Sequence, residues 1–467
     1  MKLAQLLRCE KKLADVEIKG ITNDSMRVEE GFLFVNTNGN TEYDTHAIQN
    51  GAAVVVTSNK LSFENAVFVE DTTQSFAKVC ADWYGNPAKK LKILGVTGTN
   101  GKTSVTYMLK AILEAKGKKV GVIGTNKYLI GDREIPSINT TPNAYYLNGL
   151  FSEMVKENCE YVVMEVSSHG LAQGHLIGID FKVGMFTNLS QDHLDFHKDM
   201  QDYFETKVKL FDSCETAVIN ADDEYGKTLL NRINCKAVTY STLNNSDFLA
   251  KGINCLPHRT SYKLLCDSLV AVEVNTGGNF TVYNSLCAIA CARLLGISVT
   301  DSSNALLKFK GVKGRAEVVE NTKDFTVIID YAHTPDGLKN LLKTFKKCVR
   351  NRLILVFGCG GDRDKTNRGL MGEIASIYAD YVIVTSDNPR TENPKEIIND
   401  IVKGIPNGLF KGKIIENRVE AIKFALSFAE KDDIIVLAGK GHETYQIIGK
   451  QKFPFDEREI VKTALQA

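Results

Sequence analysis

The stretch Gly98-Thr99-Asn100-Gly101-Lys102-Thr103 restricts the possible folds of this chain more than any other. It follows an apolar run, Lys92–Val96, that is typical of a buried strand, and it precedes a helical pattern. Glycines let backbone N–H groups approach a phosphate, and the start of a helix adds positive potential. The stretch therefore predicts a phosphate-binding loop, with Lys102 at the β- and γ-phosphates of ATP and the Thr103 hydroxyl at Mg²⁺.

Val96 stands where the strict phosphate-loop pattern has a glycine. A glycine-rich turn that binds no nucleotide is therefore the alternative. We favour the phosphate loop, because a strand, two glycines, a lysine and a threonine all coincide with the start of a helix.

A chain of 467 residues is too long for one hydrophobic core, and its pattern divides it into three α/β domains. Residues 1–87 alternate short strands, such as Gly31–Val35 and Ala52–Thr57, with helices. Residues 88–314 contain continuous apolar strands separated by helices, which predicts a parallel sheet covered on both faces. Residues 315–467 repeat that pattern, which predicts a Rossmann-like domain.

Composition argues against several classes of protein. The net charge of +1 gives no sign of a nucleic-acid surface or an acidic tail. The sequence has no signal peptide and no run of 18 apolar residues, so we expect a cytoplasmic protein without membrane insertion. Eleven cysteines without a C-x-x-C pair favour free thiols in a reducing compartment over disulfides or a zinc site.

Two segments of the second domain follow predicted strands and carry candidate metal ligands. Glu165 comes directly after the strand Tyr161–Met164, and an acidic residue in that position commonly holds Mg²⁺ beside a phosphate loop. A glutamate that faces solvent is the alternative. The segment Thr187–His197 contains two histidines and two aspartates within six residues, which favours a metal or phosphate role.

Lys207 lies in a predicted helix, Met200–Phe211, on the same face as Tyr203, Leu210 and Phe211. Spacing alone favours a lysine whose aliphatic stem packs on the core while its charged end stays in water. From the residues alone, a structural role for Lys207 is therefore preferred.

Four predicted strands of the third domain lead into charged or glycine-rich loops. These strands are Phe325–Asp330, Leu353–Phe357, Tyr381–Thr385 and Asp433–Leu437. Open α/β sheets bind ligands at the carboxyl ends of their strands. Arg363 and Arg390 in these loops suit a carboxylate, and Glu443 suits an ammonium group. We therefore predict a pocket for a charged amino acid.

Taken together, these motifs resemble those of the Mur ligase family, the ATP-dependent enzymes that add amino acids to the cell-wall precursor. The family segments G-T-N-G-K-T, E-V-S-S-H, T-N-L-x-x-D-H-L-D-x-H and D-Y-A-H-x-P all occur here, and the resemblance covers the whole chain. It is closest to the members that add the third residue of the peptide. Val96 is also typical of the family and no longer argues against ATP.

The resemblance implies an α/β fold in three domains. Residues 1–87 would be a small UDP-binding α/β domain, residues 88–314 a central P-loop-type ATPase domain with a parallel sheet, and residues 315–467 a Rossmann-like domain that binds the amino acid. It also implies a monomer whose partners are small molecules and not nucleic acid.

The resemblance also assigns roles to individual residues. ATP would contact Gly98, Thr99, Asn100, Gly101, Lys102, Thr103, Ser104, Asn284, Arg315, Asp330 and His333. The UDP-muramoyl-dipeptide would contact Ser25, Asn139, Thr140, Thr141, Ser167, Gln173 and His175. The amino acid would contact Arg363, Asp387, Asn388, Pro389, Arg390, Gly439 and Glu443. Mg²⁺ would be held by Thr103, Glu165, His193 and Lys207, and the catalytic residues would be Lys102, His193 and Lys207.

Lys207 gains a new interpretation from the resemblance, because the family carries a carbamylated lysine in a similar Y-x-x-x-K-x-x-L-F context. Carbamylation makes the side chain an anion that can bind a second Mg²⁺. Two departures from the family concern substrate contacts: Met26 and His175 each replace an arginine. A third is Thr281, which stands where the adenine segment usually has asparagine.

The implied reaction joins meso-diaminopimelate to UDP-MurNAc-L-Ala-D-Glu through an acyl phosphate, in peptidoglycan synthesis. The motif Asp387-Asn388-Pro389-Arg390 favours this diacid, because lysine-adding relatives usually lack the arginine. L-lysine or another diamino acid such as lanthionine remains an alternative. So do a ligase similar to folylpolyglutamate synthetase and a regulatory protein that binds nucleotide without ligating.

Overall fold

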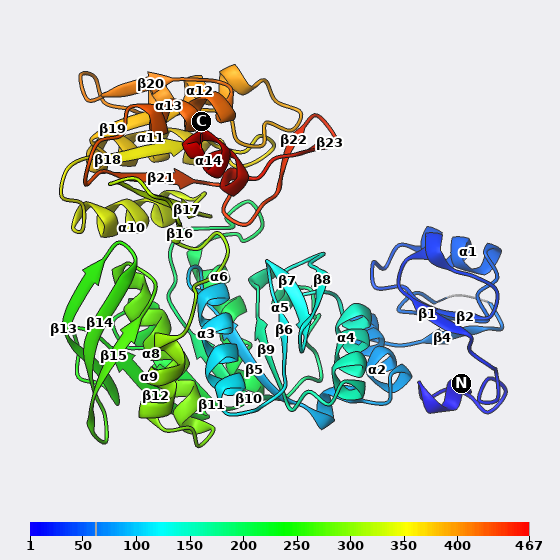
Figure 1. Cartoon of the computed structure of the whole chain (residues 1–467). Helices are drawn as coiled ribbons and strands as arrows, with labels where there is room; N and C mark the ends of the chain where they lie inside the picture. Colours follow the sequence, from blue (N-terminus) through cyan, green and yellow to red (C-terminus); the bar gives the residue numbers. More distant parts are fainter. Residues whose placement is uncertain (61–62, 467) are drawn as a thin grey trace.

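The computed structural model describes residues 1–60 and 63–466. Its three main sheets define three units, which follow one another along the chain (Figure 1). We refer to them as the amino-terminal unit (β1–β4), the central unit (β5–β15) and the carboxyl-terminal unit (β16–β21). The α/β fold class is confirmed, whereas the boundaries at residues 87 and 314 stay predictions.

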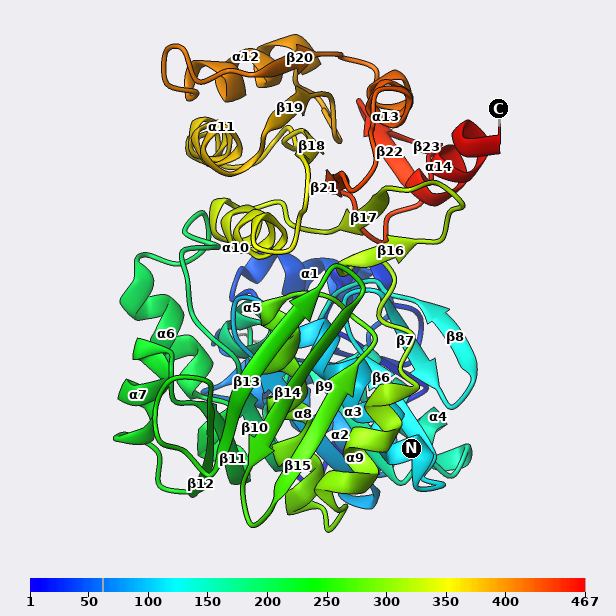
Figure 2. The same cartoon turned by 60° about the vertical axis from the view of Figure 1, so that its left-hand side comes forward.

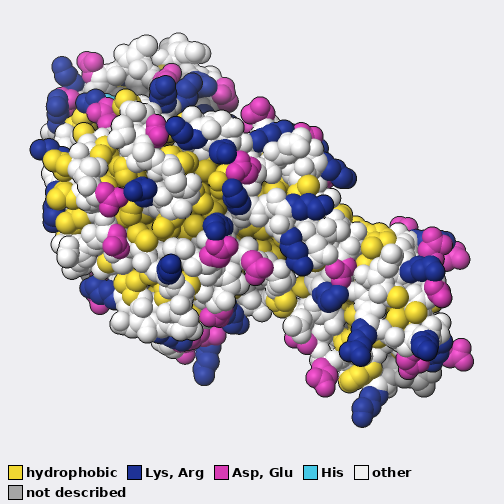
Figure 3. All heavy atoms as spheres, turned by 90° about the horizontal axis from the view of Figure 1, so that it is seen from below, with side chains coloured by type: hydrophobic (Ala, Val, Ile, Leu, Met, Phe, Trp, Pro, Cys, Tyr) yellow, Lys and Arg dark blue, Asp and Glu magenta, His cyan; other side chains and the backbone are white. Residues whose placement is uncertain are grey.

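The amino-terminal unit has a four-stranded parallel sheet in the order β1-β2-β3-β4. Its elements are β1 (Gly20–Thr22), β2 (Phe32–Val35), α1 (Thr41–Gln49), β3 (Val54–Thr57), β4 (Ala66–Phe68) and α2 (Thr72–Trp83). Helix α2 packs with Ala144 of the central unit in one hydrophobic cluster. That contact attaches the unit, which otherwise stands apart as a separate lobe (Figures 1 and 3).

The central unit is built on an eleven-stranded sheet in the order β15-β14-β13-β12-β11-β10-β5-β9-β6-β7-β8. Its strands are β5 (Lys92–Thr97), β6 (Val120–Ile123), β7 (Lys127–Ile130), β8 (Arg133–Pro136), β9 (Tyr161–Glu165), β10 (Phe181–Phe186), β11 (Cys214–Asn220), β12 (Lys236–Ser241), β13 (Phe248–Leu256), β14 (Arg259–Leu265) and β15 (Leu269–Val274). Its helices are α3 (Lys102–Ala115), α4 (Ala144–Lys156), α5 (Ser168–Ala172), α6 (Met200–Val208), α7 (Glu224–Leu230), α8 (Asn279–Leu294) and α9 (Val299–Leu307).

Both faces of this sheet are covered, as its continuous apolar strands predicted. Leu94 and Val96 of β5 face a cluster with α3 and α8, whereas Ile93 faces a cluster with α4 and α6. The strands from β12 to β6 across the middle are parallel, which confirms the parallel core. The sequence did not predict the antiparallel pairs at both edges, β6-β7-β8 and β13-β14-β15.

The carboxyl-terminal unit has a six-stranded sheet in the order β16-β17-β21-β18-β19-β20, and only β16 pairs in antiparallel fashion. Its strands are β16 (Glu317–Val319), β17 (Thr326–Asp330), β18 (Leu353–Phe357), β19 (Tyr381–Val384), β20 (Gly412–Ile414) and β21 (Ile434–Ala438), and β22 (Tyr445–Ile448) and β23 (Gln451–Pro454) form a separate hairpin. Its helices are α10 (Pro335–Lys346), α11 (Thr366–Tyr378), α12 (Pro394–Lys403), α13 (Arg418–Ser427) and α14 (Glu457–Gln466). Hydrophobic clusters cover both faces.

The helix predicted for Met200–Phe211 ends earlier than expected. The α-helix stops at Val208, and a 3₁₀ turn occupies Phe211–Ser213. The Leu210 N–H donates to the Lys207 carbonyl, so the helix tightens at its end before the chain enters β11 at Cys214.

Two expectations from composition concern the cysteines and the membrane. All eleven cysteines are free thiols, and Cys80, Cys287 and Cys291 are buried as their apolar surroundings predicted. Among the helices that the structure describes, none combines the length and the hydrophobicity needed to cross a bilayer.

A buried ion pair joins the last two helices. Arg418 of α13 donates through Nε and Nη2 to Glu457 Oε1 of α14, at 2.9 and 2.8 Å, and both side chains are fully buried. Arg418 Nη2 also donates to the Ala438 carbonyl at the end of β21. Because removal of one partner leaves an unpaired buried charge, the pair is sensitive to single substitution.

We expect Arg418→Met to lower the free energy of unfolding of the carboxyl-terminal unit by about 3–5 kcal/mol, since Glu457 loses its partner. Equilibrium unfolding in urea measures this change. The double variant Arg418→Met/Glu457→Leu should recover most of the loss. Lys423→Met, which breaks an exposed pair with Glu420, should change the value by no more than about 1 kcal/mol. An equal effect of R418M and K423M would contradict the expectation.

Candidate functional site

The phosphate-loop sequence lies at the carboxyl end of β5, between the ends of β9 and β10. Helix α3 begins directly at Lys102, so its free N–H groups face the loop. A cavity of about 1030 Å³ opens here. It is lined by residues 99–104 of the loop and by many, though not all, of the residues between 330 and 348 of the carboxyl-terminal unit, among others. The loop that the sequence singled out therefore forms the floor of a cavity between two units.

Two glycines of the loop pack too closely on the rest of the site to carry a side chain. A Cβ on Gly98, at φ +140°, would lie 2.0 Å from Thr187 Oγ1. A Cβ on Gly101, at φ +90°, would lie 2.4 Å from Asn284 Oδ1. Positive φ and close contact both require glycine at these positions.

Lysine side chains gather over the loop. Lys102 Nζ donates to the carbonyls of Gly98 and Thr99, at 2.8 and 2.9 Å. Lys207 Nζ donates to the same Gly98 carbonyl at 3.2 Å. Burial lowers the pKa of Lys102, while the charge of Glu165 opposes that shift. Two amines that share one backbone oxygen form a strongly electropositive centre, which suits a polyphosphate.

Lys207 is buried over its whole length, with 1% of its surface exposed. Its Nζ lies 4.5 Å above the ring centroid of Tyr203, whose hydroxyl is 3.3 Å from Thr99 Oγ1. The expectation of a lysine with its charged end in water is therefore wrong, because α6 packs with its amine directed at the loop. Burial lowers the pKa of Lys207 well below its usual value, and the charge of Lys102 adds to the effect. A lowered pKa favours the neutral form of the amine, which carbamylation requires.

Glu165, at the end of β9, also lines the cavity. Its carboxylate accepts from the N–H of Thr125 at 3.0 Å and from the Thr125 hydroxyl at 2.9 Å. The carboxylate is buried, so the alternative of a solvent-facing glutamate is wrong. Thr125 fixes the direction of the side chain and was not singled out from the sequence.

His193 and Asp192 line the same cavity, in the segment that follows β10. His193 has a φ of +55°, and its Nε2 lies 3.5 Å from Asp192 Oδ2. Loss of hydration lowers the pKa of His193, and the charges of Lys102 and Lys207 act in the same direction. A neutral imidazole is the form that can bind a metal ion.

The donor set at the loop fits Mg²⁺. Within residues 1–60 and 63–466, no group of three or more His, Cys, Asp or Glu side chains is arranged to hold a metal by itself. Mg²⁺ usually takes one or two protein oxygens and completes its shell with water and substrate phosphates. The Thr103 hydroxyl and the Glu165 carboxylate, both in the cavity, supply such oxygens.

The other residues assigned to the nucleotide also line this cavity: Asn284 on α8, and Arg315, Asp330 and His333 at the start of the carboxyl-terminal unit. Arg315 Nη2 donates to Thr103 Oγ1 at 3.2 Å. Asp330 is occupied with the backbone, since it accepts from the N–H groups of Ala316 and Ala332 at 2.6 and 2.8 Å. The structure thus brings the loop and these distant residues together.

The residues assigned to the muramoyl-dipeptide fall into two places. Thr141 Oγ1 donates to the Glu165 carbonyl and accepts from the Ser167 N–H, both at 2.9 Å. His175 Nδ1 lies 3.1 Å from the Thr141 carbonyl, and Thr140 and Ser167 line the cavity. Asn139 adjoins this group, its carbonyl accepting from a tyrosine hydroxyl, and Gln173 caps α5. Ser25 lies apart in the amino-terminal unit.

The amino-terminal unit approaches the central unit close to Ser25. Arg27, two residues further on, reaches Tyr146 of α4 at 3.4 Å, and Met26 between them is largely exposed. The sequence placed Met26 where relatives carry arginine. In this structure it is Arg27 that extends across the gap between the units.

The residues assigned to the amino acid come together at the carboxyl ends of β18, β19 and β21, which are neighbours in the sheet. Arg390 Nη1 donates to the Gly361 carbonyl at 2.6 Å, and Asn388 Nδ2 donates to Glu443 Oε2 at 2.9 Å. A Cβ on Gly439 would lie 2.7 Å from Asp387 Oδ2. Pro389 completes the loop, which turns at Arg390 with a φ of +48°.

Lys440 belongs to this cluster, although the sequence did not single it out. Its buried amine donates to Asn388 Oδ1 at 3.0 Å and to Glu443 Oε2 at 2.9 Å. One oxygen of Glu443, which was expected to receive a substrate ammonium, is therefore paired within the chain. One feature of the sequence could have identified Lys440: it lies in the glycine-rich loop after β21, on the same edge of the sheet as the predicted residues.

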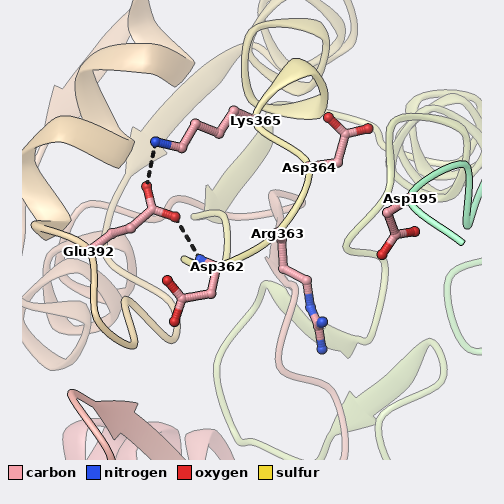
Figure 4. A pocket seen from close by; sticks show the side chains of 6 residues that line it. All are labelled: Asp195, Asp362, Arg363, Asp364, Lys365 and Glu392. Carbon is pink, nitrogen blue, oxygen red and sulfur yellow. Dashed lines mark hydrogen bonds and ion pairs between the residues drawn. The ribbon is translucent and has the colours of Figure 1, made fainter. Parts of the chain in front are cut away.

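Arg363 lies in a second pocket of about 430 Å³, lined by Asp195, Asp362, Arg363, Asp364, Lys365 and Glu392 (Figure 4). Among the described residues, no hydrogen bond or ion pair engages its guanidinium, which extends into the pocket opposite Asp195 of the central unit (Figure 4). The structure does not merge this pocket with the larger cavity. Of the residues assigned to the amino acid, Arg363 lines this smaller pocket, and the lining of the larger cavity includes none of them.

Comparisons with known proteins agree with this geometry. The family model of the Mur ligase middle domain matches residues 96–292, and that of the Mur ligase glutamate ligase domain matches residues 314–441. UDP-N-acetylmuramoyl-L-alanyl-D-glutamate–2,6-diaminopimelate ligase of Caldanaerobacter subterraneus is 49% identical over 460 residues, which are 97% of this chain and 95% of the relative. A ligase of the same name from Clostridium acetobutylicum is 46% identical and covers 96% of this chain and 94% of its own.

A solved structure that carries this ligase name superimposes with a TM-score of 0.74. It is 32% identical and covers 100% of this chain and 99% of its own. The similarity thus extends from the amino-terminal unit to the carboxyl-terminal unit.

We expect Gly98→Ala to weaken ATP binding by more than about tenfold, because the new Cβ would collide with Thr187 and displace the loop. Isothermal titration calorimetry with ATP measures the affinity. Gly117→Ala is the matched control: it also changes a glycine of positive φ, but its Cβ meets no atom within 4 Å. Wild-type affinity in the G98A variant would refute the loop packing as the reason for glycine.

Proposed function

The chain belongs to the Mur ligase family, and from that premise we propose that it is an ATP-dependent ligase that joins meso-diaminopimelate to UDP-MurNAc-L-Ala-D-Glu in peptidoglycan synthesis. The relatives that it resembles along its full length carry this activity in their names. The proposed reaction forms an amide and converts ATP to ADP and phosphate. It requires a polyphosphate site and an amino-acid site that can meet.

The observation that carries the choice of amino acid is the pair of arginines at the carboxyl-terminal sheet edge. Arg363 has no hydrogen-bond or ion-pair partner among the described residues, and Arg390 uses only Nη1, on a backbone carbonyl. Each guanidinium can therefore offer further donors to a carboxylate. A diacid with an amino group, such as meso-diaminopimelate, needs more cationic contacts than L-lysine does.

In the first stage, the γ-phosphoryl group of ATP would move to the D-glutamyl γ-carboxylate, which yields an acyl phosphate and ADP. Both reacting groups are anions, so their repulsion must be neutralised. Lys102 would exchange the carbonyls of Gly98 and Thr99 for phosphate oxygens. The free N–H groups at the start of α3 would hold the same oxygens.

Mg²⁺, when bound, would add positive charge beside the transferred group. Thr103 and Glu165 would supply oxygen ligands to one ion, and Glu165, a carbamylated Lys207 and an imidazole nitrogen of His193 would hold a second. Lys207 is suited to this state, because its amine is buried beside Lys102 and has a lowered pKa. As a carbamate, it would replace a repulsive positive charge with a negative one.

In the second stage, the amine of the amino acid would attack the acyl carbon, form the C–N bond and release phosphate. Water at this point would hydrolyse the intermediate, so the site must exclude it. Residues 330–348 of the carboxyl-terminal unit already form one wall of the cavity. Closure of the unit would bring the pocket of Arg363 towards the acyl phosphate.

The other candidate functions receive less support. A ligase similar to folylpolyglutamate synthetase would usually carry G-K-G-S where this chain has Gly101-Lys102-Thr103-Ser104. A regulatory protein that only binds nucleotide would have no need for a buried Lys207 that faces the loop together with Glu165 and His193.

Release of inorganic phosphate, measured with ATP, UDP-MurNAc-L-Ala-D-Glu and one candidate amino acid at a time, tests the substrate. We expect turnover with meso-diaminopimelate and little with L-lysine. Turnover with lysine alone would overturn the assignment of the amino acid. Absence of turnover with every amino acid would favour a regulatory protein.

We expect Lys207→Ala to reduce kcat by about 10²–10³-fold or more, since a ligand of the second Mg²⁺ is lost. Added short carboxylates should restore part of the activity by replacing the carbamate. Lys209→Ala, at an exposed position beyond the end of the same helix, is the control and should stay active. An active K207A enzyme, or one that no carboxylate rescues, would contradict the proposed carbamate.

A further inference from the structure

The carboxylate of Asp336, in the carboxyl-terminal unit, contacts the phosphate loop of the central unit. Asp336 lies in the first turn of α10, the helix that lies against the central unit (Figures 1 and 2). Its Oδ2 accepts from Asn100 Nδ2 at 3.0 Å and from Ser190 Oγ at 2.7 Å. A third donor, Asn340 Nδ2 at 3.1 Å, comes from α10 itself. Asp336 thus ties together three segments that are far apart in the sequence.

The contact continues from Ser190 to the buried lysine. The Ser190 N–H donates to Thr99 Oγ1 at 3.0 Å, and Thr99 Oγ1 donates to the Ser190 carbonyl at 3.2 Å. The same hydroxyl lies 3.3 Å from the hydroxyl of Tyr203, whose ring covers Lys207. A continuous series of polar contacts therefore leads from α10 through the loop to Lys207.

The charge of Asp336 is unexpected at this place. An anion beside a phosphate-binding loop opposes the binding of a polyphosphate. Hydrogen bonds from neutral donors to a carboxylate are stronger than those between neutral groups. Because Asp336 lies in the first turn of α10, the helix holds its carboxylate in position before the bonds form. The carboxylate is therefore better suited to holding α10 on the loop than to contacting phosphate.

We propose that Asp336 is a positioning residue that clamps α10 to Asn100 and Ser190, and thereby couples closure of the carboxyl-terminal unit to the arrangement of the phosphate loop. Its kinetic consequence rests on the proposed ligase function. While the clamp holds, the wall made by residues 330–348 keeps water from the acyl phosphate. Without it, the unit opens more often and hydrolysis competes with the attack of the amine.

The experiment compares Asp336→Ala and Asp336→Asn with the control Lys339→Ala, at an exposed position of the same helix that does not line the cavity. The first readout is the ratio of ADP to amide product. We expect this ratio to stay near one in the wild type and K339A, and to rise clearly in D336A. We also expect kcat/KM for the amino acid to fall by about ten- to a hundredfold in D336A, the loss of a hydrogen bond to a charged group. D336N keeps one acceptor oxygen, so its kcat/KM for the amino acid should lie between the values of the wild type and D336A.

Hydrogen exchange of the ligand-free protein is the second readout. The amides of residues 98–104 and 334–340 should exchange faster in D336A than in K339A, because the clamp is lost only in the former. This measurement needs no turnover, so it decides on the clamp even if the wild type ligates no amino acid and the proposed function fails.

Two results would overturn the inference. Equal exchange in D336A and K339A would show that Asp336 does not hold the units together. A wild-type ratio of ADP to amide in D336A would show that the contact does not protect the intermediate, whatever the exchange pattern. If D336A folds poorly, D336N provides both comparisons, since it preserves the size of the side chain.

Discussion

The parallel pairing of β5 with both β9 and β10 is the constraint on which the site depends. In this register Val96 lies beside Glu165, and Thr97 lies beside Phe186, so the three strands end at one level. The phosphate loop, the acidic ligand and the segment with His193 therefore start from a common edge. The Thr99 N–H donates to the Asn188 carbonyl at 2.9 Å, which holds the loop against that edge.

Charge is concentrated at this edge before any substrate arrives. Lys102 and Lys207 donate to one carbonyl, and burial holds the pKa of each below its ordinary value. Buried cations that meet only neutral oxygens are unfavourable, and an anionic ligand would relieve that cost. Because the donors are already in place, little reorganisation is needed when charge develops in the reaction.

The carboxyl-terminal unit contributes in two ways, through a wall of the larger cavity and through a separate pocket. Arg315 and Asp336 reach the loop residues Thr103 and Asn100 directly. Asp195 lines the pocket of Arg363 and follows the same strand, β10, as His193. Short segments of the central unit therefore connect the larger cavity with the pocket of Arg363. Small movements of the carboxyl-terminal unit can change the distance between the two.

The amino-acid sequence by itself determined the strands, the phosphate loop and the loops that carry the arginines, because these follow from local hydrophobic runs and from glycine and lysine spacing. It did not determine the edge hairpins, the burial of the Lys207 amine, the pairing of Lys440 with Glu443 or the contact of Asp336 with Asn100. These features depend on which distant segments meet when the sheets assemble. Only the tertiary structure decides such contacts, since no local pattern records the distance between two loops that belong to different strands.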